Sequence, residues 1–296
     1  MPTQTAPIRD QVHVIGANGR SGQAVCRALS EAGIPFVPLV RSLAKWDATG
    51  LPGAARVIDL TDHYSLTVAL HDATRLVSCA HARHTQALVD AILPDVLMVL
   101  LGSTRRYTRW PDGHGRGVMQ GERVFLGSGR PGVMLHPTMI YGAEGEDNVQ
   151  RLAALLHRLP VVPLPGGGRA LVQPIHQSDV TRSIMAALAR NWSEPEILVI
   201  AGPAALPYAD FVGEVAHAAG LAMPRFMNAP AALLMALAPF TAFMPGIPSI
   251  GRDEIRRLTE DKAFSIGPMV SRLGVIPIPL AAGLAATFQH AWVNRS

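Results

Sequence analysis

The stretch Val12–Gly22, which reads VHVIGANGRSG, decides how the rest of the chain is arranged. An apolar start is followed by three glycines, Gly16, Gly19 and Gly22, and then by an apolar spacing typical of a helix. The pattern predicts a strand, a tight turn and a helix. The first glycine permits a turn that a side chain would obstruct, the second lets the backbone approach a pyrophosphate, and the third lets the helix pack closely against the strand. Because the helix N-terminus would also face the phosphates, we expect a dinucleotide site; a glycine-rich turn without a ligand is the alternative.

Composition narrows the class of protein. A chain of 296 residues, about half of them apolar, can hold one large α/β domain with or without a smaller appendage. The net charge of +4 comes from scattered residues, which argues against nucleic acid binding. Cys26 and Cys79 lack metal-type spacing, and the N-terminus lacks a basic-then-apolar targeting signal, so we expect a cytoplasmic protein without a metal site.

Apolar runs alternate with helical patterns along the first half of the chain. This alternation predicts a parallel sheet with right-handed crossovers, and therefore a doubly wound, Rossmann-like α/β domain. We expect that domain over residues 8–201, with returning strands near 171–175 and 196–201, and a small, mainly helical substrate lobe over residues 202–296. The expected strands after the first are 34–40, 55–60, 75–80, 95–101 and 133–136.

The glycine spacing and four later segments resemble the extended and atypical short-chain dehydrogenase/reductases, a group that includes NAD(P)-dependent nucleotide-sugar epimerases, dehydratases and NmrA-like proteins. The segment 59–62 (DLTD) resembles the stretch whose first Asp contacts adenine, and 136–142 (HPTMIYG) resembles R-P-x-x-[IV]-Y-G with His136 in place of Arg. Residues 173–180 and the tail 260–277 match the family less specifically. The resemblance implies a nicotinamide cofactor and a C-terminal region that selects the substrate.

The end of the second strand indicates which nicotinamide cofactor is used. NAD-selective folds place an acidic residue there, whereas this chain has Arg41 and Ser42, which suit a 2′-phosphate. Arg20 lies within the glycine turn and can reach the same group. We expect NADP rather than NAD; two solvated arginines are the alternative. The expected cofactor contacts are Gly16, Asn18, Gly19, Arg20, Ser21, Gly22, Arg41, Ser42, Asp59, Leu60, Ala80 and Pro137.

The family's Y-x-x-x-K pair is missing, because no tyrosine in the chain is followed by lysine four residues later. Alignment of the segment around Gly121 places His114, within a polar loop (105–117), on the Tyr position, and Val118, at the start of a helix (118–128), on the Lys position. The family's catalytic Ser or Thr, just past the fifth strand, corresponds to Ser103 or Thr104, and proton transfer would fall to His114 or Tyr107. His81 and His84 are interpreted as surface or capping residues.

Two functions fit these residues. One is an enzyme of the epimerase/dehydratase or reductase kind that acts on a sugar nucleotide or another carbonyl or hydroxyl substrate. The other is a non-catalytic, NmrA-like sensor of NADP(H) that acts through a partner, which the missing pair suggests. The tail's resemblance to catalytic epimerases favours the enzyme, as a monomer or homodimer.

The stretch 227–251 contains no charged residue and is long enough to span a bilayer. Its four prolines interrupt a long helix, so we expect two short buried helices instead. Peripheral contact with a membrane or with a lipid-linked substrate is the alternative.

Overall fold

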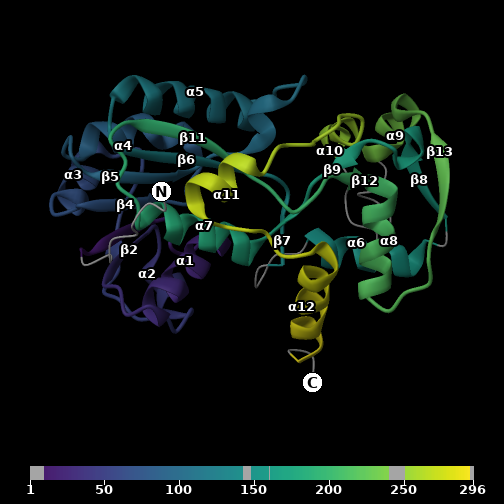
Figure 1. Ribbon diagram of the computed structural model, residues 1–296, viewed down its shortest axis with the longest axis horizontal. Helices are drawn as coiled ribbons and strands as arrows, with labels where there is room; N and C mark the ends of the chain where they lie inside the picture. The colour runs from purple at the N-terminus through teal and green to yellow at the C-terminus, as the bar shows by residue number, and fades with distance from the viewer. Residues whose placement is uncertain (1–9, 143–147, 160, 240–250, 294–296) are drawn as a thin grey trace. The chain divides into compact units, whose positions relative to one another are not determined.

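The computed structural model describes residues 10–142, 148–159, 161–239 and 251–293. Its main feature is a sheet of seven parallel strands in the order β11-β6-β5-β4-β1-β2-β3 (Figure 1). The chain order reverses between β1 and β4, so the expected doubly wound α/β fold is confirmed. The strands are β1 (Val12–Ile15), β2 (Phe36–Val40), β3 (Arg56–Val57), β4 (Arg75–Ser78), β5 (Leu97–Leu101), β6 (Gly132–Pro137) and β11 (Pro195–Ile200).

Strand β1 lies inside the sheet, between β4 and β2, and all four of its residues are buried. A strand covered on both faces is expected to be continuously apolar, and β1 departs from this only at the buried His13, whose Nε2 lies 3.1 Å from an oxygen of Asp72. Four of the neighbouring β2 residues are buried as well. The glycine turn therefore starts from the middle of the domain, where its position is well defined.

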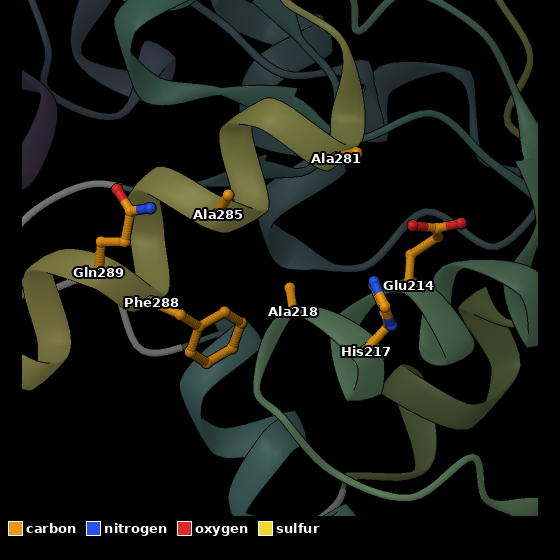
Figure 2. Close-up of a pocket in the computed structure, with 7 residues that line it drawn as sticks. All are labelled: Glu214, His217, Ala218, Ala281, Ala285, Phe288 and Gln289. Atoms are coloured by element: carbon orange, nitrogen blue, oxygen red, sulfur yellow. The ribbon is translucent and has the colours of Figure 1, made fainter.

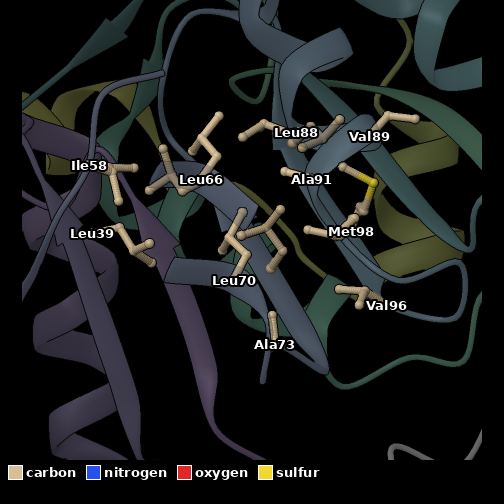
Figure 3. Close-up of a cluster of buried hydrophobic side chains, with 14 of the residues drawn as sticks. Leu39, Ile58, Leu66, Leu70, Ala73, Leu88, Val89, Ala91, Val96 and Met98 are labelled. Atoms are coloured by element: carbon tan, nitrogen blue, oxygen red, sulfur yellow. The ribbon is translucent and has the colours of Figure 1, made fainter. Parts of the chain in front are cut away.

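Helices cover both faces of the sheet. One face carries α3 (His63–Leu70), α4 (Thr85–Ala91) and α5 (Gly113–Ser128), and the other carries α1 (Arg20–Glu31) and α7 (Gln177–Leu188) (Figure 1). Figure 3 shows the apolar cluster beneath α3 and α4, in which Leu66, Leu70 and Leu88 pack against strand residues such as Leu39 and Met98. Burying a leucine or methionine side chain contributes about 1.5–3 kcal/mol, so this cluster is a major source of stability. The remaining elements near the sheet are α2 (Leu43–Asp47), α11 (Gly267–Leu273) and the 3₁₀ turns η1 (Ala82–His84) and η2 (Thr104–Tyr107).

The chain divides into two compact units, each built from three segments. The first contains the sheet and comprises residues 1–137, 177–200 and 266–276; the second comprises 138–176, 201–265 and 277–296. One crossing between the units lies at 200/201, residues 138–176 belong to the second unit, and residues 266–276 belong to the first. The second unit contains β7 (Ile140–Tyr141), α6 (Asn148–Arg158), β8 (Val161–Pro165), η3 (Gly166–Gly168), β9 (Leu171–Val172), β10 (Ile175–His176), β12 (Leu206–Pro207), α8 (Tyr208–Ala218), β13 (Arg225–Ala229), α9 (Ala231–Leu237), α10 (Arg252–Arg257) and α12 (Leu280–Val293).

One returning strand was correctly expected and the other was not. The strand near 196–201 is β11, which pairs with β6. The segment 171–175 does not join the central sheet: β9 pairs with β12, and β10 pairs with β7. Short apolar runs do not reveal which partner they will find, because pairing is decided by residues distant in sequence.

The uncharged stretch differs from its expected structure. Its first helix forms as α9, but no residue of α9 is buried, and Leu233 and Leu237 are each about half exposed. A seven-residue helix that is apolar on every side can cover only the side facing its neighbours, here α10 and β8. Residues 240–250 of the stretch lie outside the described residues. Within the described part of the chain, no helix is both long and apolar enough to cross a bilayer.

Candidate functional site

The glycine turn has the geometry that a pyrophosphate requires. Gly16 adopts a φ of +74°, and the backbone N–H of Gly19 donates to the Gly16 carbonyl at 2.8 Å. A Cβ on Gly22 would collide with the Gly16 carbonyl oxygen and lie 2.8 Å from Cα of Ala17. A Cβ on Gly16 would be 3.3 Å from the backbone of Ala80, so glycine at both positions lets the turn pack closely against β4 and α1, as in turns that cradle a dinucleotide phosphate.

Two residues of this turn that were expected to contact the cofactor, Asn18 and Ser21, make hydrogen bonds within the protein. The Asn18 side chain donates to the Ser42 carbonyl at 2.9 Å, which connects the turn to the end of β2. The Ser21 hydroxyl donates to the Gln177 side chain on α7 at 3.1 Å. Both donors therefore fix the position of the turn.

The end of β2 carries the groups expected to select the cofactor. Arg41 and Arg20 are exposed at the same edge of the sheet as the glycine turn, because β1 and β2 are parallel neighbours. Ser42 caps α2 by accepting from the Lys45 N–H at 3.4 Å. The edge therefore presents two guanidinium groups to solvent beside the turn.

Asp59 and Leu60 follow β3 at the same edge. One Asp59 oxygen accepts from the backbone N–H and the hydroxyl of Thr61, at 2.8 and 2.7 Å. These hydrogen bonds, assisted by the charge of Arg41, lower the pKa of the exposed Asp59 carboxyl. Asp59 is consequently ionised and can accept a hydrogen bond from a base amino group. Ala80, after β4, lies beside the turn, since a Cβ on Gly16 would be 3.3 Å from its nitrogen.

The residues after β5 are anchored to the end of β6. The Ser103 N–H donates to Nδ1 of His136 at 2.9 Å, and the Ser103 hydroxyl accepts from the Arg105 N–H at 3.2 Å. The buried Thr104 donates its hydroxyl proton to the Pro137 carbonyl at 3.1 Å. Ser103 is half-buried and nearer to solvent, whereas Thr104 and Pro137 are buried. Ser103 is therefore better placed than Thr104 to bind a substrate oxygen.

A buried ionic network of Glu122, His136 and Arg106 supports this segment. The sequence did not predict that these three side chains would meet. Nε2 of His136 donates to Glu122 at 2.8 Å, and Arg106 donates to both Glu122 oxygens. Burial raises the pKa of Glu122, but the hydrogen bonds from His136 and Arg106 outweigh it and lower the pKa to about 2. A side chain on Gly102 would collide with the His136 ring. In the sequence, the only indication of this network was His136, which stands where the resembling family has Arg.

Tyr107 is an exposed phenol next to this network. Its side chain is 46% exposed, and the guanidinium of Arg106 lies 4.7 Å from its ring centre. Burial of the hydroxyl raises the pKa of Tyr107, with Arg106 opposing and Glu122 adding to the effect. The phenol is therefore protonated near neutral pH, and the structure lacks the lysine that would change this: Lys45 lies on α2, and Lys262 pairs with Glu260 at 3.1 Å.

His114 lies in a helix rather than in the expected loop. Helix α5 begins at Gly113 instead of near Val118, because Asp112 caps it by accepting from the Gly115 N–H at 2.7 Å. The His114 ring meets the His81 ring edge to face, with centroids 4.3 Å apart. His81 also caps η1, as expected for a capping residue. Among the described residues, no three His, Cys, Asp or Glu side chains are arranged to hold a metal ion.

Solved structures of similar fold are numerous, although no family model and no curated protein matches the chain. The structure of UDP-glucuronic acid 4-epimerase from Bacillus cereus with UDP-glucuronic acid and NAD is 16% identical, with a TM-score of 0.72 over 96% of this chain and all of that one. The chain shares the fold of this NAD-bound epimerase. MoeE5 in complex with UDP-glucose and NAD shares this fold at 20% identity and a TM-score of 0.71, over 97% of this chain and all of that one. The NADPH-dependent quinone oxidoreductase of Escherichia coli, complexed with NADPH, shares it at 18% identity and a TM-score of 0.73, over 95% and 99%.

In the second unit, the tail that resembles epimerases has an architectural role. The Leu171 N–H donates to Asp261 at 2.9 Å, and the Lys262 N–H donates to the Leu171 carbonyl at 2.8 Å. The buried Gln173 side chain bonds both backbone groups of Phe264. These contacts align the tail along β9.

A hollow of about 320 Å³ lies between α8 and α12 of the second unit (Figure 2). Its apolar wall includes Phe288 and three alanines, and the exposed Glu214 and His217 project from one turn of α8. Neither side chain belongs to the residues expected from the sequence. The hollow is open to solvent, and we assign no chemistry to it.

Proposed function

We propose that the protein is an NADP(H)-dependent reductase that transfers hydride to a small carbonyl or quinone substrate. The observation that carries this proposal is the glycine turn at the carboxyl end of the central strand, flanked by Arg20 and Arg41. When bound, NADPH supplies the hydride. The chain's own residues bind the cofactor and orient the substrate: Ser103 hydrogen-bonds the carbonyl oxygen, and Asp59 and Leu60 receive the adenine.

The protonated state of Tyr107 favours reduction over oxidation in this proposal. Oxidation of a hydroxyl group requires a base to remove its proton, and the family obtains one from the Tyr–Lys pair. Here the pKa of Tyr107 is raised and the two lysines lie elsewhere. Reduction requires a proton donor instead, which a protonated side chain or water can provide. The residues therefore favour a reductase over an epimerase.

Cofactor selection can be tested by calorimetric titration with NADPH and NADH. Loss of one charge-assisted hydrogen bond costs about 1.5–3 kcal/mol, so Arg41→Ala should weaken NADPH binding by about 10- to 100-fold and leave NADH binding unchanged. Arg123→Ala, at an exposed position on α5, is the matched control. An unchanged affinity ratio in Arg41→Ala would exclude the assignment of Arg41 to the 2′-phosphate.

A non-catalytic NADP(H) sensor is the second candidate. It is favoured by the missing Tyr–Lys pair and by the engagement of the Thr104 hydroxyl with Pro137. The two functions are separated by following NADPH fluorescence with sugar nucleotides, quinones, flavins and prenyl aldehydes. Turnover with a quinone or aldehyde supports the reductase, whereas tight NADPH binding without turnover supports the sensor.

A further inference from the structure

Two imidazoles meet at the edge of the sheet where the cofactor is expected. His81 follows β4 by three residues, and His114 lies in the first turn of α5. Their ring centroids are 4.3 Å apart and their planes are inclined by 79°. Both residues are half-buried. Ala80, the neighbour of His81, lies beside Gly16 of the turn, so the pair is close to the glycine turn in the first unit.

The glycines of α5 explain why these rings meet. Five of the 16 residues of α5 are glycine, and each glycine inside a helix costs about 1 kcal/mol relative to alanine. A Cβ on Gly117 would lie 2.8 Å from Cε1 of His81, and a Cβ on Gly121 would collide with the Ala82 carbonyl. Glycine at these positions, which are one helical turn apart, therefore lets η1 approach α5. His81 lies against Gly117, one turn along α5 from His114.

The surroundings of His81 determine its tautomer and charge. Its Nδ1 accepts from the Arg83 N–H at 3.0 Å, so the ring proton lies on Nε2. Burial lowers the pKa of His81, the positive charge of Arg83 and the neighbouring His84 and Arg105 add to this, and Asp112 opposes it. Asp112 is itself paired with Arg105 at 3.5 Å. His81 is thus neutral near pH 7, and the Arg83 hydrogen bond fixes the orientation of its ring against His114.

We propose that His114 is the proton donor of the reduction and that His81 is the positioning residue that orients it. This inference rests on the proposed reductase function. The substrate accepts one hydride with its two electrons, and the oxygen that gains negative charge takes one proton from His114. His114 then regains a proton from water, so the overall reaction is NADPH + H⁺ + oxidised substrate → NADP⁺ + reduced substrate. The histidine pair thus takes the place of the Tyr–Lys pair.

The kinetic test uses NADPH with 1,4-naphthoquinone and 4-nitrobenzaldehyde as probes. Because general acid catalysis contributes about 10²- to 10⁴-fold, His114→Gln should lower kcat by about that factor with the dissociation constant of NADPH unchanged. His81→Gln should lower kcat by about tenfold. His63→Gln, at an exposed site on α3, is the control and should match the wild-type protein.

A second pair of variants tests the positioning by glycine. Gly117→Ala introduces the Cβ that meets His81, whereas Gly127→Ala adds the same atom to the same helix where nothing lies within 4 Å. Gly117→Ala should lower kcat as His81→Gln does, without weakening NADPH binding. Gly127→Ala should leave kcat unchanged.

The third readout does not depend on turnover. Imidazole proton resonances of the cofactor-free protein, followed by NMR against pH, should show that His114 titrates at a different pH in His81→Gln than in the wild-type protein and in His63→Gln. A His114 titration that is identical in His81→Gln overturns the positioning role, and kcat within twofold of wild type in His114→Gln overturns the donor role. Wild-type protein that binds NADPH but reduces neither probe overturns the proposed function instead.

Discussion

Replacement of the buried Glu122 by Gln should destabilise the protein in a way that depends on pH. The Glu122 side chain is 6% exposed and receives hydrogen bonds from His136 and Arg106, which lower its pKa to about 2 despite burial. An unfolded chain titrates at the ordinary glutamate pKa of about 4.3. The folded state therefore stabilises the ionised carboxylate of Glu122, and the neutral amide in Glu122→Gln does not receive this stabilisation.

The size of the effect follows from the two pKa values. At about 1.4 kcal/mol per pH unit, the interval between about 4.3 and about 2 corresponds to about 3 kcal/mol, and solvent around the one-third-exposed Arg106 reduces this to about 2 kcal/mol. The folded pKa is depressed, so this stability is present above pH 4.3 and is lost as the pH falls toward 2. About half of it should remain at pH 3.

Urea unfolding measures the difference directly. We expect the free energy of unfolding of Glu122→Gln to lie about 2–3 kcal/mol below that of the wild-type protein at pH 7, and the gap to narrow by about half at pH 3. Glu31→Gln, which changes an exposed glutamate at the end of α1, should stay within about 0.5 kcal/mol of wild type at both values. A gap below 1 kcal/mol at pH 7, or one that is equal at both pH values, would refute the reasoning.

Three further variants test other parts of the fold. Burial lowers the pKa of His13, so the unfolded chain takes up a proton at a higher pH than the folded chain. The free energy of unfolding should therefore decrease as the pH falls below about 6.5, by up to about 1.4 kcal/mol per pH unit. In a series of urea-unfolding measurements at different pH values, His13→Asn should remove that decrease. Gly22→Ala forces a Cβ against Gly16 and Ala17 and should abolish NADPH binding measured by calorimetry; binding at wild-type strength would contradict the close packing described for the turn. Gly127→Ala, at an open helical position, should raise the free energy of unfolding by about 0.5–1 kcal/mol, and a decrease would show that the site is more crowded than described.

Local patterns predicted the central sheet well and the second unit poorly. Strands β2 and β5 were found close to their expected positions because each is a continuous apolar run, and β1 was found because three of its four residues are apolar and it runs directly into Gly16. The segment 138–176 forms part of the second unit, where β8 pairs with β13 and β9 with β12. Those strands consist of two to five residues, too few for periodicity to identify their partners.

The start of α5 was missed for a similar reason. A run with four glycines in nine residues, from Gly113 to Gly121, has low helix propensity. The Asp112 cap and the close approach of η1 compensate for that cost. Packing against a distant segment thus overrides local preference, and it moves His114 from a loop into a helix.

By itself, the sequence determined the strand, turn and helix of residues 12–31 and the absence of a Tyr–Lys pair, and Arg41 at the end of the second strand is the residue that supports the proposed 2′-phosphate site. These are properties of adjacent residues, so they can be read from spacing alone. Only the tertiary structure decided that His81 meets His114 and that Glu122 joins His136 to Arg106. Those partners lie 14 to 33 positions apart and come from different strands and helices, so their contact depends on how the sheet brings the strand ends together.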